Sequence, residues 1–126
     1  MQDYLKFYIN GEWVNPVGAK FLDVINPATE EAVAKISLGR QSDVNAAVAA
    51  ARHSFDSFSQ SSKEDRLALL DRIIDTYKKR YDELAESITL EMGAPLSLSK
   101  AAQAAAGLKH LMTARNVLVN YIFQEK

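Results

Sequence analysis

The chain has 126 residues, the size of one ordinary domain. Its 15 basic and 16 acidic residues leave a formal net charge of −1, which gives no support for nucleic acid or an anionic membrane as a partner. It contains no cysteine, which excludes disulfides, thiolate metal ligands and a cysteine nucleophile within these residues. No apolar run long enough to span a membrane occurs, and the opening residues lack the pattern of a signal peptide, so we expect a cytoplasmic protein.

The first forty residues predict two antiparallel β-hairpins. Aromatic and β-branched residues over 7–14 flank Asn10-Gly11, a pair typical of a type I′ hairpin turn. Strands over 21–25 and 32–38 are expected to pair across a turn at Pro27, because proline fixes its own φ and disfavours a helical conformation at the preceding residue.

The spacing of apolar residues then predicts a first helix that begins at Ser42 or Asp43, either of which can cap it. Its apolar positions recur every three or four residues, as on one face of an α-helix. They are Val44, Ala47, Val48, Ala51, Phe55 and Phe58.

A second, longer helix is predicted over 62–92. Ser61 and Glu64 have the spacing of a capping box, and Gly93 followed by Pro95 is a typical helix end. Such a helix would be about 45 Å long and would need a partner along its length, or a break. Its apolar stripe consists of Leu70, Ile74, Tyr77, Tyr81, Leu84 and Ile88.

A third helix is predicted after Pro95, with Ser97 or Ser99 as its cap. Apolar residues recur every three or four positions as far as Ile122. Arg115 interrupts this stripe, so we expect its guanidinium either to reach solvent or to pair with a carboxylate of another element. Together the elements predict an α+β fold of two small hairpins followed by three helices, in one incomplete domain with a strand region over 1–40 and a helical region over 41–126.

No constellation of residues with recognisable chemistry occurs in the chain. His53 and His110 are its two histidines, and neither has a partner at metal-ligand spacing. The five glycines are scattered and form no phosphate-binding loop. The residues alone therefore predict no catalytic, cofactor-binding or metal-binding site.

The order of the motifs, however, resembles the amino-terminal segment of the aldehyde dehydrogenase superfamily. Each motif is weak alone, but the series in this order and spacing is specific. It comprises the aromatic hairpin 8–14, Ile25-Asn26-Pro27-Ala28-Thr29, the strand 33–36, the alanine-rich helix 43–52, Arg66 and Leu70, 82–85 and Thr89-Leu90-Glu91-Met92-Gly93-Ala94-Pro95.

The resemblance implies that the chain is a truncated part of an enzyme that oxidises an aldehyde to a carboxylic acid with NAD or NADP. In the family a cysteine thiolate attacks the aldehyde, a hydride passes to the nicotinamide, and a glutamate activates the hydrolytic water. The matching segment holds none of these residues and no cofactor loop, so we expect this chain alone to be inactive and to bind no cofactor.

The resemblance also implies two minor sites. Some family members hold a monovalent cation near the positions equivalent to Ile25 and Gln103. At the position of Gln103, the family has an acidic residue. The neutral amide of Gln103 predicts only weak cation binding here. Met112 and Arg115 are expected to lie near the entrance of the substrate funnel.

Two further expectations concern partners. Residues such as Trp13, Phe55, Leu70, Tyr81 and Met112 would leave apolar surface uncovered in a fragment, so we expect self-association, with the stripe of the long helix as its seam. The alternative function, from a different class, is a free-standing helical module that binds another protein and catalyses nothing.

Overall fold

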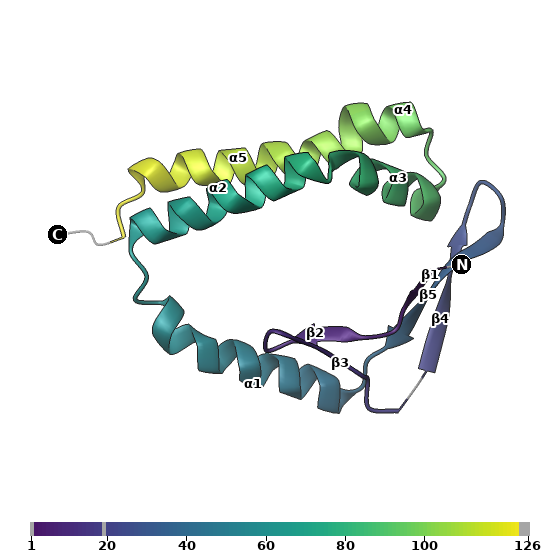
Figure 1. The fold of residues 1–126 in the computed structure, drawn as a ribbon, viewed down its shortest axis with the longest axis horizontal. Coiled ribbons are helices and arrows are strands. Elements are labelled where there is room, and N and C mark those ends of the chain that lie inside the picture. The colour runs from purple at the N-terminus through teal and green to yellow at the C-terminus, as the bar shows by residue number, and fades with distance from the viewer. Residues whose placement is uncertain (1, 19, 124–126) are drawn as a thin grey trace. The chain divides into compact units, whose positions relative to one another are not determined.

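The computed structural model describes residues 2–18 and 20–123 and divides into two compact units, Met1–Gln60 and Ser61–Lys126 (Figure 1). Among its described residues, the first unit contains five strands and one helix: β1 (Gln2–Tyr4), β2 (Phe7–Ile9), β3 (Glu12–Val14), β4 (Lys20–Asn26), β5 (Glu31–Leu38) and α1 (Gln41–Phe58). The second unit is helical: α2 (Lys63–Lys79), α3 (Tyr81–Met92), α4 (Leu96–Leu98), the π-helical turn η1 (Ser99–Gln103) and α5 (Ala104–Asn120).

Both predicted hairpins are present. β2 pairs antiparallel with β3, and β4 pairs antiparallel with β5. Asn10 and Gly11 have φ values of 54° and 82°, as a type I′ turn requires. The strand β1 was not predicted; it pairs in parallel with β5 and completes a three-stranded sheet in the order β1-β5-β4. A three-residue strand carries too little periodicity to be recognised from its own residues.

The strands end at Leu38 and the helices begin at Gln41, on either side of the predicted change of region after residue 40. The two compact units divide at a different point, after Gln60, so that α1 lies in the first unit. The N-cap of α1 is Arg40, so the predicted cap at Ser42 or Asp43 was wrong. Asp43 lies three residues after the cap and holds α1 to the segment before it. Its buried carboxylate lies in the first turn of α1 and accepts hydrogen bonds from the backbone N–H of Arg40 at 2.8 Å and of Val17 at 3.0 Å. Because the second bond is with a residue that precedes β4, α1 belongs structurally with the strands.

Below about pH 4 we expect the first unit to lose stability as Asp43 is protonated. The backbone hydrogen bonds from Arg40 and Val17 lower the pKa of its carboxyl below the ordinary value of 3.8. A group with a lowered folded pKa contributes stability above its unfolded pKa, and this is lost as the pH falls through the folded pKa. Thermal unfolding followed by circular dichroism between about pH 7 and about pH 3 measures this.

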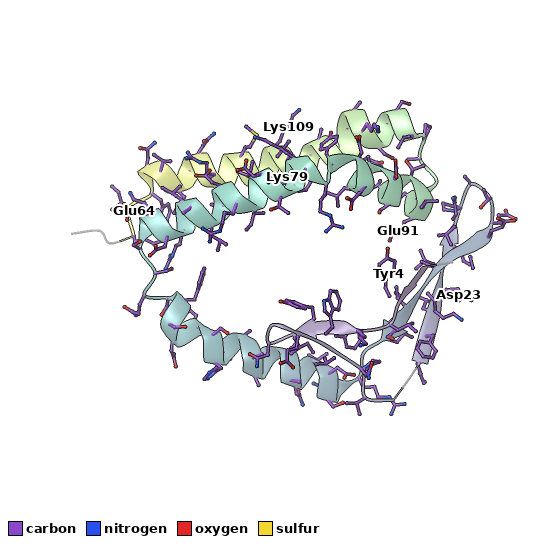
Figure 2. All side chains as sticks on the ribbon, viewed as in Figure 1. Tyr4, Asp23, Glu64, Lys79, Glu91 and Lys109 are labelled. Atoms are coloured by element: carbon purple, nitrogen blue, oxygen red, sulfur yellow. The ribbon has the colours of Figure 1, made fainter. Side chains whose placement is uncertain are left out.

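Asp43→Asn should lower the melting temperature at neutral pH. The melting temperature of this variant should also fall less steeply than that of the parent chain as the pH is lowered. Asp23→Asn is the control, because Asp23 (Figure 2) lies on β4 in an exposed ion pair with Lys35 at 3.8 Å. An acid profile that Asp43→Asn leaves unchanged would contradict the prediction.

The predicted long helix is broken at Arg80, whose φ of −105° and ψ of 17° are not helical. The capping box at its start lies one residue later than we predicted. Ser62 Oγ accepts from the N–H of Asp65 at 3.0 Å, and the Asp65 carboxylate accepts from the N–H of Ser62 at 3.2 Å. Ser61 instead accepts from Arg66 Nε. Consecutive serines and consecutive acids offer two registers, and the local sequence does not distinguish them. Glu64 (Figure 2) remains in the first turn of α2, where its charge complements the helix dipole.

The second unit is an antiparallel helical hairpin in which α2 runs beside α5 (Figure 1). The start of α2 is hydrogen-bonded to the end of α5, and the end of α2 is hydrogen-bonded to the start of α5. Lys63 Nζ donates to the carbonyl of Val119, and Tyr77 donates to the carbonyl of Ala104. Buried apolar residues lie in this unit: Ile74, Ala85 and Ala104. Gly93 ends α3 with a left-handed φ of 67°, as predicted.

The third predicted helix begins at Leu96, directly after Pro95, so neither Ser97 nor Ser99 caps it. Ser99 is instead fully buried within η1. Pro95 occupies the cap position without a side-chain hydrogen bond, and its carbonyl accepts from the N–H groups of Leu98 and Ser99.

Candidate functional site

The π-helical turn η1 contains Gln103, one of the predicted site residues. At its end the N–H of Ala104 donates to the carbonyl of Ser99, five residues back. Widening a helix in this way leaves carbonyls without their usual partners, and π-turns of this kind often occur at functional sites.

Two tyrosines of the opposite helices satisfy carbonyls at this turn. Tyr81, the first residue of α3, donates its hydroxyl to the carbonyl of Lys100. Tyr77 of α2 donates to the carbonyl of Ala104 at 2.8 Å. Their rings contact each other edge to face, with centroids 6.3 Å apart. These hydroxyls were predicted as part of an apolar stripe, and their polar role was missed.

The amide of Gln103 is engaged within the helical unit. Its Oε1 accepts from the hydroxyl of Ser99 at 3.1 Å, and Thr89 Oγ1 donates to that same serine oxygen at 2.9 Å. Its Nε2 lies 3.9 Å from the sulfur of Met92. Among the described residues, no buried side-chain nitrogen or oxygen lacks a hydrogen-bond partner. The cluster is therefore a closed polar network that holds η1 against α3.

Ile25, the other residue of the predicted cation site, lies on β4 in the first unit. It pairs with Ala32 at a β-bulge, where the register shifts between Val24 and Ile25. The described residues contain no group of three or more His, Asp or Glu side chains placed to hold a metal ion. The cation site at Ile25 and Gln103 stays a prediction.

Arg115 pairs with a carboxylate of another element, as one of the two expectations stated. Its Nε and Nη2 lie 2.7 Å and 3.3 Å from the two oxygens of Asp71 on α2. This bidentate pair raises the pKa of Arg115 and lowers that of Asp71. The sequence contained a signal for this partner. Asp71 directly follows Leu70 and lies three residues before Ile74, so its carboxylate lies beside the apolar stripe that was predicted to be covered by another element.

Met112 lies one turn before Arg115 on α5 and is exposed. The structure thus places the two predicted entrance residues on one helix. Arg115 is paired with Asp71, while Met112 is exposed without such a partner shown. Neither contributes a nucleophile or a titratable group free to act as a general acid or base.

The predicted seam for self-association is occupied within the chain. Leu70, Ile74, Tyr77 and Tyr81 are buried or half-buried, and the elements that carry them pack on α5 and η1. The exposed apolar residues lie elsewhere, and α1 has several: Val44, Val48, Phe55 and Phe58. Among the described helices, none has the length and apolar character needed to cross a membrane.

Comparison with known proteins gives a consistent result. The model of the aldehyde dehydrogenase family matches residues 13–120. A 3-succinoylsemialdehyde-pyridine dehydrogenase from Pseudomonas sp is 50% identical over 126 residues, which cover 99% of this chain and 26% of that protein. A putative aldehyde dehydrogenase of Staphylococcus aureus is 46% identical over the same length and is likewise covered to 26%.

Solved structures agree. The aldehyde dehydrogenase of Bartonella henselae has a TM-score of 0.97 and 39% identity over 99% of this chain and 26% of its own. Aldehyde dehydrogenase C of Pseudomonas syringae, determined as a mutant with NAD+ and octanal, has a TM-score of 0.93 and 43% identity over 96% of this chain and 25% of its own. The chain therefore spans about a quarter of the length of the relatives it matches.

Proposed function

Because the chain belongs to the aldehyde dehydrogenase family, we propose that it is the amino-terminal part of an enzyme that oxidises an aldehyde to a carboxylic acid with NAD or NADP. The observation that carries this proposal is the family match over residues 13–120, together with 50% identity to a semialdehyde dehydrogenase. The match favours this function over a free-standing interaction module. We propose a cytoplasmic location for the same protein.

In such an enzyme these strands and helices would support the outside of the cofactor-binding domain. Met112 and Arg115 would lie near the substrate entrance, with Asp71 fixing the guanidinium of Arg115 through two hydrogen bonds. A cation near Ile25 and Gln103 would be held weakly, because the amide oxygen of Gln103 already accepts from Ser99 and has no formal charge.

The 126-residue chain alone is expected to form no NADH from an aldehyde and NAD+. Covalent catalysis in the family needs a cysteine thiolate, and this chain contains no cysteine. Absorbance of NADH during incubation with octanal, and separately with a semialdehyde, measures this.

The matching control is a single-chain chimera in which this chain replaces the first quarter of the 50% identical Pseudomonas relative. The chimera is expected to oxidise the relative's aldehyde. A chimera that folds but is inactive would contradict the proposed function, and turnover by the chain alone would contradict its predicted inactivity.

We further propose that the isolated chain self-associates. Its exposed large apolar residues occur in both units and include Trp13, Phe55 and Met112, and contiguous apolar patches of a few hundred Å² are uncommon on stable monomers. Sedimentation velocity at micromolar concentrations is expected to show dimers or larger species whose share grows with concentration. A single monomeric species at every concentration would refute this.

A further inference from the structure

The last residue of α3, Met92, combines an exposed side chain with a hydrogen bond to its sulfur. Met92 is 59% exposed. Its thioether accepts from Gln103 Nε2, with the nitrogen 3.9 Å from the sulfur. Because thioether sulfur is a weak acceptor, this bond contributes less than a bond from the same amide to an oxygen would. The contact can therefore be strengthened by chemistry at the sulfur.

The contact lies where the chain turns back from α3 to η1. Met92 precedes Gly93, whose left-handed backbone ends α3, and Gln103 is the last residue of η1. The same two elements are joined at a buried position by the hydrogen bond from Thr89 Oγ1 to Ser99 Oγ at 2.9 Å. A stronger bond between Gln103 and Met92 would therefore hold η1 more firmly against α3.

Oxidation by a hydroperoxide is the chemistry that strengthens a thioether as an acceptor. A lone pair of the sulfur attacks the peroxide, a sulfur–oxygen bond forms and the oxygen–oxygen bond breaks. With hydrogen peroxide as the oxidant, the thioether is oxidised to a sulfoxide and the peroxide is reduced to water. The product carries a polar oxygen in place of an apolar sulfur surface. This oxygen accepts hydrogen bonds far better than the thioether does.

We propose that Met92 is a site of oxidation by peroxides, and that its sulfoxide accepts a hydrogen bond from Gln103 and stabilises the helical unit. Oxidation of a buried methionine places a polar group in an apolar core and destabilises the fold. Met92 differs, because it is exposed and already faces an amide donor. Its flexible, unbranched side chain lets the new oxygen turn toward Nε2. Reduction by a methionine sulfoxide reductase restores the thioether, so the change is reversible.

The test treats the chain with hydrogen peroxide and follows its thermal unfolding. In the variant Met112→Leu, which conserves side-chain volume, complete conversion of Met92 to the sulfoxide is verified by peptide mass spectrometry. The melting temperature should then rise by about 2–4 °C, because a stronger hydrogen bond forms. Met92→Leu is the matched control, since Met112 is 44% exposed and no described residue donates a hydrogen bond to its sulfur. Peroxide should not raise its melting temperature, and Met1 is common to both variants.

Gln103→Glu in the Met112→Leu background tests the donor. The carboxylate keeps an oxygen that can accept from the hydroxyl of Ser99, as the amide oxygen does at 3.1 Å, but it replaces the Nε2 donor with an acceptor. Oxidation of Met92 should then no longer raise the melting temperature. An undiminished rise in this variant, an equal rise in Met92→Leu, or no rise after complete oxidation of Met92 would overturn the proposal. Resistance of Met92 to a peroxide excess that oxidises Met112 in the parent chain would also overturn it.

Discussion

Replacing Ile74 with alanine is expected to lower the free energy of unfolding of the helical unit by about 2–4 kcal/mol. Ile74 lies on α2 and is 6% exposed, the most buried of the large apolar side chains that the structure describes. Its truncation removes buried methyl and methylene groups and leaves a cavity that the two helices can close only in part. Urea unfolding followed by circular dichroism measures the change.

The neighbouring residue provides the matched control. Ile73 is 40% exposed and occupies the same helix, so Ile73→Ala carries the same change in helix propensity without the cavity. It is expected to cost less than about 1 kcal/mol. Equal costs at the two positions would show that α2 does not pack on α5 through this face.

Replacing Gly107 with alanine is expected to destabilise the chain by about 1–2 kcal/mol, although helix propensity alone would favour alanine by about 1 kcal/mol. A Cβ at this position would collide with the hydroxyl of Tyr77 and would lie 3.1 Å from its Cζ. The ring cannot retreat without breaking the hydrogen bond from its hydroxyl to the carbonyl of Ala104. The glycine therefore lets α5 approach the tyrosine that satisfies a carbonyl at the π-turn.

A double-mutant cycle isolates this contact. In a Tyr77→Phe background the hydroxyl is absent, so Gly107→Ala should become about 1 kcal/mol less costly than in the parent chain. Ala106→Gly, at an exposed position of the same helix, measures the difference in helix propensity between alanine and glycine and should cost about 1 kcal/mol of stability. Additive effects of Gly107→Ala and Tyr77→Phe would contradict the proposed collision.

Much of the local structure could be predicted from the sequence, because it depends on neighbouring residues. The turn at Asn10-Gly11 and the left-handed end of α3 at Gly93 both rest on conformations that few residues adopt easily. The two hairpins and the helical stripes follow from short-range periodicity. The order of the motifs was enough to indicate the aldehyde dehydrogenase family, which the match over 13–120 confirms.

The tertiary structure decided the features whose partners lie far apart in the chain. The parallel pairing of β1 with β5 joins residues about thirty positions apart. The break at Arg80 and the widened turn at η1 are accommodated by Tyr77 and Tyr81, whose hydroxyls satisfy carbonyls on the facing helix. A stripe of apolar spacing indicates which face of a helix is covered but not what covers it, since that depends on contacts absent from the local sequence. For this reason the stripe of α2 and the apolar positions of α1 look alike in the sequence, while in the structure α5 packs on α2 and the α1 residues Val48 and Phe55 are exposed.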